Sequence, residues 1–295
     1  MTAGRVIDPG ATIGTVHLTV RDLAGGLAFY RDRLGFEDLG RGSGGSARLG
    51  AGGVERLVLH GDPQAPRVRG TTGLYHFAIL VPSRPDLARS LAHLLETRTA
   101  LAGASDHLVS EALYLSDPEG NGIEIYRDRP RDEWAWERGA IRLASDPLDL
   151  DGLLAEPAAR EAWTGLAPET RIGHVHLRVS RIDEAESFYV GVLGFERTAR
   201  LGDSALFVAA GGYHHHLGLN TWGGAGAPAP PSGAAGLREF VIELPDAKGR
   251  DRLADSIRKA GVDIRHEGDA FRLRDPFSNG IVLRARAERR EPARA

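Results

Sequence analysis

Cysteine is absent from the 295 residues, which excludes disulfides, thiolate metal ligands and cysteine nucleophiles. Lysine is scarce, because only Lys248 and Lys259 among the 37 basic residues are not arginine. No apolar run reaches the ~18 residues of a membrane-spanning helix, and the N-terminal stretch MTAGRVIDPG has no apolar signal-peptide core. The net charge is only −3 and the pI about 6.4, so neither a nucleic-acid nor a membrane partner is indicated. We therefore expect a cytoplasmic protein.

An internal repeat organises the chain. The stretch IGTVHLTVRDLAGGLAFYRDRLGFE begins at Ile13, and IGHVHLRVSRIDEAESFYVGVLGFE begins at Ile172. A weaker pair consists of GLYHFAIL from Gly73 and GLREFVIE from Gly236, followed by SDPEGNGIEI and RDPFSNGIVL. The four units, named A, B, A′ and B′ in chain order, indicate a duplicated architecture.

Each unit predicts the same elements. A short strand opens it, an amphipathic helix follows, and two or three short strands with glycine-rich turns close it, which makes a βαβββ module. One helix covers only one face of such a sheet, so the other face is free to curl around a cavity. We expect module pairs at 10–127 and 172–286, a tryptophan-containing connection at 128–171 and a disordered tail at 287–295.

Strand alternation places polar groups on the face away from the helix. In the opening strand of A′, Val175 and Leu177 pack on the helix side. The free face carries His17 in A, His76 in B, His174, His176 and Arg178 in A′, and Glu124 in the last strand of B. A lone carboxylate such as Glu124 is costly to bury unless its charge is compensated. Two neutral imidazoles and one carboxylate around a cavity would bind a divalent metal with open positions.

The stretch from Ser105 to Glu124 adds a local signature. It reads His107, five residues, Leu113, Tyr114, two residues, Asp117, Pro118, one residue, Gly120, three residues and Glu124. This pattern resembles that of the type I extradiol dioxygenases of the vicinal oxygen chelate superfamily, with one mismatch at Ser105. The resemblance of the modules covers nearly the whole chain and is greatest to the two-domain catechol 2,3-dioxygenases. It implies an α+β fold in which four βαβββ modules form two vicinal-oxygen-chelate barrels.

The resemblance also implies roles for individual residues. Glu124 and His76 resemble metal ligands, and His107 and Tyr114 resemble the pair that bonds a substrate oxygen. A further histidine that stabilises bound dioxygen in the family matches His215 in HHLGL. Alternation instead favours His216, so the choice within 214–216 stays open at this stage.

The remaining histidine ligand depends on which modules pair. It is His17 if A pairs with B, and His176 if A′ pairs with B. Module A′ also contains the 214–216 histidines, whereas B′ has Glu239 and Val282 where B has His76 and Glu124. We therefore expect B to pair with A′, and the ligands to be His76, Glu124 and His176.

The implied activity is Fe(II)-dependent extradiol cleavage of a catechol by dioxygen, in an expected homo-oligomer. A glyoxalase-like isomerase using nickel or zinc is one alternative, but that class usually presents a second glutamate. A metal-free small-molecule-binding protein is another, but it would not need His107, Tyr114 and Glu124 at the signature spacing. The sequence does not specify the catechol.

Overall fold

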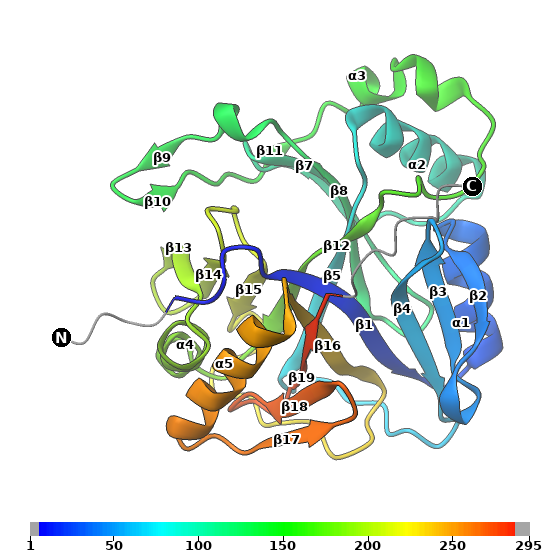
Figure 1. Cartoon of the computed structure of the whole chain (residues 1–295). Helices are drawn as coiled ribbons and strands as arrows, with labels where there is room; N and C mark the ends of the chain where they lie inside the picture. The colour runs from blue at the N-terminus through cyan, green and yellow to red at the C-terminus, as the bar shows by residue number, and fades with distance from the viewer. Residues whose placement is uncertain (1–5, 287–295) are drawn as a thin grey trace, which may run out of the picture.

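The computed structural model describes residues 6–286, and the expected tail at 287–295 lies outside them. Two large sheets pack on a shared apolar core (Figure 1). The first sheet has the spatial order β17 (Ile264–Glu267), β18 (Ala270–Arg274), β19 (Gly280–Ala285), β16 (Gly236–Leu244), β1 (Thr12–Val20), β4 (Val54–Gly61), β3 (Ala47–Ala51) and β2 (Glu37–Arg41). The second has the order β11 (Asp146–Pro147), β6 (Gly103–Asp106), β7 (Ser110–Ser116), β8 (Gly122–Asp128), β5 (Gly73–Leu80), β12 (Arg171–Arg178), β15 (Leu217–Asn220), β14 (Ala205–Ala209) and β13 (Glu196–Leu201). A small hairpin joins β9 (Trp136–Glu137) to β10 (Ala140–Ile141).

The helices cover the outer faces of these sheets. They are α1 (Leu23–Ala28), α2 (Arg84–Glu96), α3 (Leu150–Leu154), α4 (Ile182–Glu186) and α5 (Ala247–Lys259). Shorter helical turns are Phe29–Arg33 and Ser187–Val192, both π-helical, and the 3₁₀ turns Ser43–Gly45, Arg131–Glu133 and Pro157–Arg160. The Ser83 hydroxyl caps α2 by accepting from the Asp86 N–H, and Leu87, Leu91 and Leu94 form its buried stripe. No helix within 6–286 is both long and apolar enough to cross a bilayer.

The modules pair across the halves of the chain. Strand β5 of module B lies antiparallel to β12 of A′, and β1 of A lies antiparallel to β16 of B′. Each sheet therefore combines one module from 10–127 with one from 172–286. The expected α+β architecture and the pairing of B with A′ are confirmed. The alternative pairing of A with B is wrong, because β1 belongs to the other sheet.

Two buried tyrosines join the sheets at equivalent places in the repeat. The helix of module A ends in a π-helical turn that carries Tyr30, whose hydroxyl donates to Asp117 at 2.9 Å. In the second half, Tyr189 donates to Asp275 at 2.8 Å. Each contact connects a helix over one sheet to a turn of the other, since A and B, like A′ and B′, lie in different sheets.

The connection at 128–171 packs against both halves. Trp163 stacks on His93 of α2 with ring centroids 4.4 Å apart. A Cβ at Gly35 would lie only 2.4 Å from the Trp163 ring, so glycine is needed there for this packing. Trp134 contacts Tyr213 at 5.7 Å between ring centroids, and the β9–β10 hairpin extends to β13 (Figure 1). The connection thus forms a cover over the inner face of the second sheet.

Candidate metal centre and its cavity

Three adjacent strands of the second sheet position the candidate ligands. His76 lies on β5, Glu124 on β8 and His174 on β12. Ala78 of β5 is opposite both Glu124 and His174, so the register aligns these two side chains across the small Ala78. His76 is two residues before Ala78 and therefore shares its face of the sheet.

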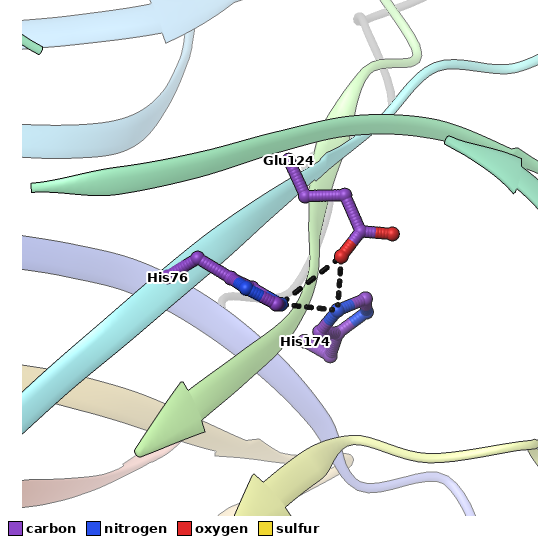
Figure 2. A group of neighbouring side chains, drawn as sticks. All are labelled: His76, Glu124 and His174. Atoms are coloured by element: carbon purple, nitrogen blue, oxygen red, sulfur yellow. Dashed lines mark hydrogen bonds and ion pairs between the residues drawn. The ribbon is translucent and has the colours of Figure 1, made fainter. Parts of the chain in front are cut away.

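The three side chains converge on one point (Figure 2). The Glu124 Oε2 atom lies 3.0 Å from His76 Nε2 and 3.1 Å from His174 Nε2. The two imidazole nitrogens are 3.4 Å apart. All three residues are buried, with His174 only 1% exposed.

The electrostatics of this cluster fit a divalent cation. Burial by itself would raise the pKa of Glu124, but His174 and His76 outweigh that effect and hold the pKa well below its usual value. Burial lowers the pKa of His174 to about 4, despite the opposing effect of Glu124. A neutral imidazole offers a nitrogen lone pair, and an ionised carboxylate leaves a buried negative charge. Two such nitrogens and one such oxygen within 4.8 Å of one another are a donor set that suits Fe(II) or a similar metal.

The second histidine in this cluster differs from the one expected. His176 was expected beside His76 and Glu124, but His174 occupies that place. Both histidines face the cavity, so alternation does not separate them. The register of the strands separates them. His174 is aligned with Glu124 across Ala78, whereas His176 is opposite His76, two residues further along β12.

His176 lies beside the cluster rather than in it. Its ring centroid is 4.9 Å from that of His76, and its Nε2 atom is buried without a hydrogen-bond partner among the described residues. Burial, followed by the nearby His76 and His174, lowers its pKa well below the usual value. A Cβ at Gly218 would come within 2.8 Å of the His176 ring, so this glycine makes room for the imidazole.

His107 and Tyr114 form a hydrogen-bonded pair next to the cluster. The Tyr114 hydroxyl lies 2.6 Å from His107 Nε2, and His107 Nδ1 lies 2.6 Å from the carbonyl oxygen of Ala144. A carbonyl only accepts, so Nδ1 carries a proton, and in the neutral ring Nε2 accepts from Tyr114. Tyr114 is directly opposite Glu124 in the β7–β8 ladder. Burial and then the charge of Glu124 raise the pKa of Tyr114.

The three consecutive histidines have different environments. His214 Nε2 pairs with Asp128 at 2.9 Å, and His216 Nδ1 accepts from the Ala210 N–H at 3.1 Å. His215 lines the cavity, with its ring centroid 4.2 Å from that of His174. Alternation favoured His216 for this position, but β15 begins only at Leu217 and the preceding residues are irregular.

These side chains line one cavity of about 980 Å³. The expected residues His76, His107, Tyr114, Glu124, His176 and His215 all border it, together with His174. Its cover comes from the connection, including Glu137, Ile141 and Arg142. The sequence reasoning did not identify this cover, nor Tyr75 and Trp222 in the wall. Tyr75 is the extra residue where the β5–β12 ladder shifts register, so it borders the same cavity as its neighbour His76.

The first sheet has no corresponding cluster among residues 6–286. The repeat places Thr15 where the second sheet has His174, and Glu239 where it has His76. His17 there lies 3.1 Å from His60, between Nδ1 and Nε2, and Glu239 pairs with Arg272. His17 and Glu239 thus both have partners within the first sheet.

Comparisons with known proteins show the family of this chain. A family model described as the Glyoxalase/Bleomycin resistance protein/Dioxygenase superfamily matches residues 12–125 and 171–283. A protein of Bacillus subtilis (strain 168) named catechol-2,3-dioxygenase is 46% identical over 275 residues, which cover 92% of this chain and 95% of that protein.

Two solved structures have a similar fold at low identity. One, from Bacillus subtilis subsp. subtilis str. 168, has a TM-score of 0.62 and 15% identity, and covers 93% of this chain and 85% of that chain. Glyoxalase I from Zea mays has a TM-score of 0.55 and 16% identity, and covers 92% of each chain. At these identities the likeness concerns the fold alone.

Proposed function

We propose that this chain, which belongs to the Glyoxalase/Bleomycin resistance protein/Dioxygenase superfamily, is an extradiol dioxygenase that cleaves a catechol next to its two hydroxyls. The expected superfamily is confirmed, and the relative named catechol-2,3-dioxygenase supports this reaction. One observation supports it most: two imidazole nitrogens and a carboxylate oxygen converge in a cavity beside a hydrogen-bonded histidine–tyrosine pair.

The proposed metal is Fe(II), held by His76, Glu124 and His174. A set of two histidines and one carboxylate is typical of non-haem iron oxygenases, because it leaves positions for substrate and dioxygen. Bound there, Fe(II) would bring catechol and dioxygen together and let electron density pass between them. We prefer His174 to the expected His176 because its Nε2 atom lies 3.1 Å from the Glu124 oxygen.

His107 and Tyr114 are proposed to manage the protons of the substrate. The hydrogen bond from His107 Nδ1 to Ala144 fixes the tautomer, so Nε2 is the atom that gains or loses a proton. Through Tyr114, 2.6 Å away, this nitrogen can accept a proton from a catechol hydroxyl and return it to product. His215 borders the same cavity, with its ring centroid 4.2 Å from that of His174, so its neutral imidazole can donate to a developing negative charge there.

The connection forms part of the cavity wall and so reduces the access of water to the cluster from that side. Interactions with charge strengthen where fewer water molecules compete. The cytoplasmic location and the homo-oligomeric state expected from the sequence stay predictions.

Loading the protein with Fe(II) without oxygen, then adding catechol and air, tests the proposal. We expect one dioxygen consumed per catechol and a yellow semialdehyde product. Glu124→Gln is the control, since it removes the charge with little change of shape. Formation of a muconic acid would show cleavage between the hydroxyls, and absence of oxygen uptake with a panel of catechols would refute the reaction.

A further inference from the structure

One half-buried cation, Arg178, borders the cavity without an acidic partner among residues 6–286. Arg178 lies on β12, four residues after His174 and two after His176, so all three side chains share a face. Its guanidinium has no hydrogen bond or ion pair to any of residues 6–286. It lies over the Tyr75 ring instead, 5.4 Å from the ring centroid. A half-buried arginine normally has an acceptor for its planar set of donors.

The other basic residues of the cavity differ from Arg178. The Arg200 guanidinium pairs with Asp183, Glu186 and Asp203. Arg142 is exposed on the cover, where water solvates its charge. Arg178 alone among these three is both half-buried and unpaired.

The position of Arg178 is specific to the module with the metal cluster. Its repeat counterpart in module A is Thr19, as Thr15 is the counterpart of His174. Both differences occur on the same strand face, and only the second sheet holds the convergent donors described above. Gly223 packs closely on this side chain, since a Cβ at Gly223 would lie 2.9 Å from Arg178 Cδ.

The size of the cavity allows a substituent to reach this arginine. Four strand residues separate the backbones of His174 and Arg178 by roughly 13 Å, and both side chains project into the same space. A cavity of about 980 Å³ is at the upper end for small-molecule sites and far larger than a single diphenol ring requires. The wall near Arg178 contains Tyr75 and Trp222, whose ring centroids are 5.3 Å apart and can contact the apolar part of a side chain.

We propose that Arg178 is a specificity-determining residue that binds an anionic substituent of the substrate, so that the preferred substrate is a catechol with an acidic side chain. This inference rests on the proposed ring cleavage and names its substrate class. A carboxylate would accept two hydrogen bonds from the planar guanidinium, which is the geometry that this group favours. The substituent would extend along β12 from the metal cluster, past His176, to the wall formed by Tyr75 and Trp222.

A matched pair of diphenols tests the proposal. 3,4-Dihydroxyphenylacetate carries the charge, and 3,4-dihydroxyphenylethanol is its neutral analogue. With iron-loaded protein, kcat/KM should favour the anion by roughly ten- to hundredfold, the effect of a partly buried charge-assisted contact. Arg178→Gln should abolish this preference while leaving unsubstituted catechol within about threefold, and Arg178→Lys should retain part of it.

Arg142→Gln is the matched control, because Arg142 borders the same cavity but is solvated. It should keep the preference for the anion. Equal kcat/KM for the two diphenols in the wild type, or loss of the preference in Arg142→Gln but not in Arg178→Gln, would overturn the proposal. Thermal melts of each variant establish that it is folded.

Calorimetry without oxygen separates this inference from the reaction itself. Titration of the iron-loaded protein with each diphenol measures binding in the absence of turnover. If no catechol is cleaved but the anion binds in an Arg178-dependent way, the reaction is refuted and the anion site stands. If both diphenols are cleaved and bound equally well, the reaction stands and the anion site is refuted.

Discussion

Replacing His174 by alanine should remove most of the metal affinity, whereas replacing His176 should not. The two residues lie on the same strand, face the same cavity and are both almost fully buried. They differ in one respect that matters for ligation. His174 Nε2 lies 3.1 Å from the Glu124 oxygen and 3.4 Å from His76 Nε2, while the nitrogens of His176 lie outside this group.

The expected magnitude follows from the number of donors. Metal binding at a four-ligand structural zinc site contributes roughly 10–16 kcal/mol, or about 3 kcal/mol per ligand. Losing one of three protein ligands should therefore weaken binding about a hundredfold or more. His176→Ala removes no donor from the cluster, and the His176 Nε2 atom makes no hydrogen bond to a proposed ligand. The dissociation constant should therefore change by less than about tenfold, the lower limit for residues that hydrogen-bond a ligand.

Competition with a chelator under anaerobic conditions measures these constants for Fe(II), and metal content after gel filtration provides a second measurement. His76→Ala is the positive control and should match His174→Ala. His17→Ala is the negative control, because His17 lies in the first sheet and contacts His60 instead. A hundredfold loss in His176→Ala together with retention in His174→Ala would refute the assignment and restore the ligand set expected from strand alternation.

Three further predictions concern other parts of the molecule. The variants Tyr114→Phe and His107→Ala should still bind iron, but their kcat should be about 10²–10⁴-fold lower, as expected for groups that transfer protons. Loss of iron on metal analysis would contradict these roles. Tyr189→Phe removes one hydrogen bond to the buried Asp275 carboxylate, which still accepts from Phe277 and Asn279, so denaturant unfolding should show a loss of about 1–3 kcal/mol; an unchanged midpoint would mean that the contact between the sheets contributes little. Burial lowers the pKa of His17 from 6.5 to about 4. Between these pH values the unfolded chain binds a proton that the folded protein does not, so stability should fall as the pH decreases from 6.5 towards 4. Melts at several pH values should show a weaker pH dependence for His17→Gln, and an identical dependence in both proteins would exclude His17 as its source.

Much of the fold follows from local pattern in the sequence. Alternation correctly places His76 and Glu124 on the cavity side of their strands, because side chains in a regular strand alternate between faces. The short spacing from His107 to Tyr114 brings both residues into one hairpin next to Glu124. The pairing of modules followed from asking which combination supplies enough donors, and the order of strands agrees.

Register and bulges limit the same reasoning. Alternation is identical for His174 and His176, and only the alignment of β12 with β5 shows which is next to Glu124. That alignment depends on tertiary packing between modules far apart in the chain. Tyr75 is a second example, since a shift in the ladder brings it to the cavity that alternation assigns to its neighbour His76.

The repeat itself favours His174 over His176 as the proposed ligand, although alternation places both on the cavity face. The opening strands of A and A′ both have a histidine at the position of His17 and His176, so that histidine does not distinguish the sheet with the metal cluster from the sheet without it. His174 does, because its counterpart is Thr15. A duplicated module that binds no metal has no need of a donor at the ligand position, and its neighbouring groups can pair with one another, as Glu239 does with Arg272. In a duplicated fold with one candidate centre, residues that differ between the copies are therefore candidate ligands. In this chain the proposed ligands His174, His76 and Glu124 all meet this criterion, and His176 does not.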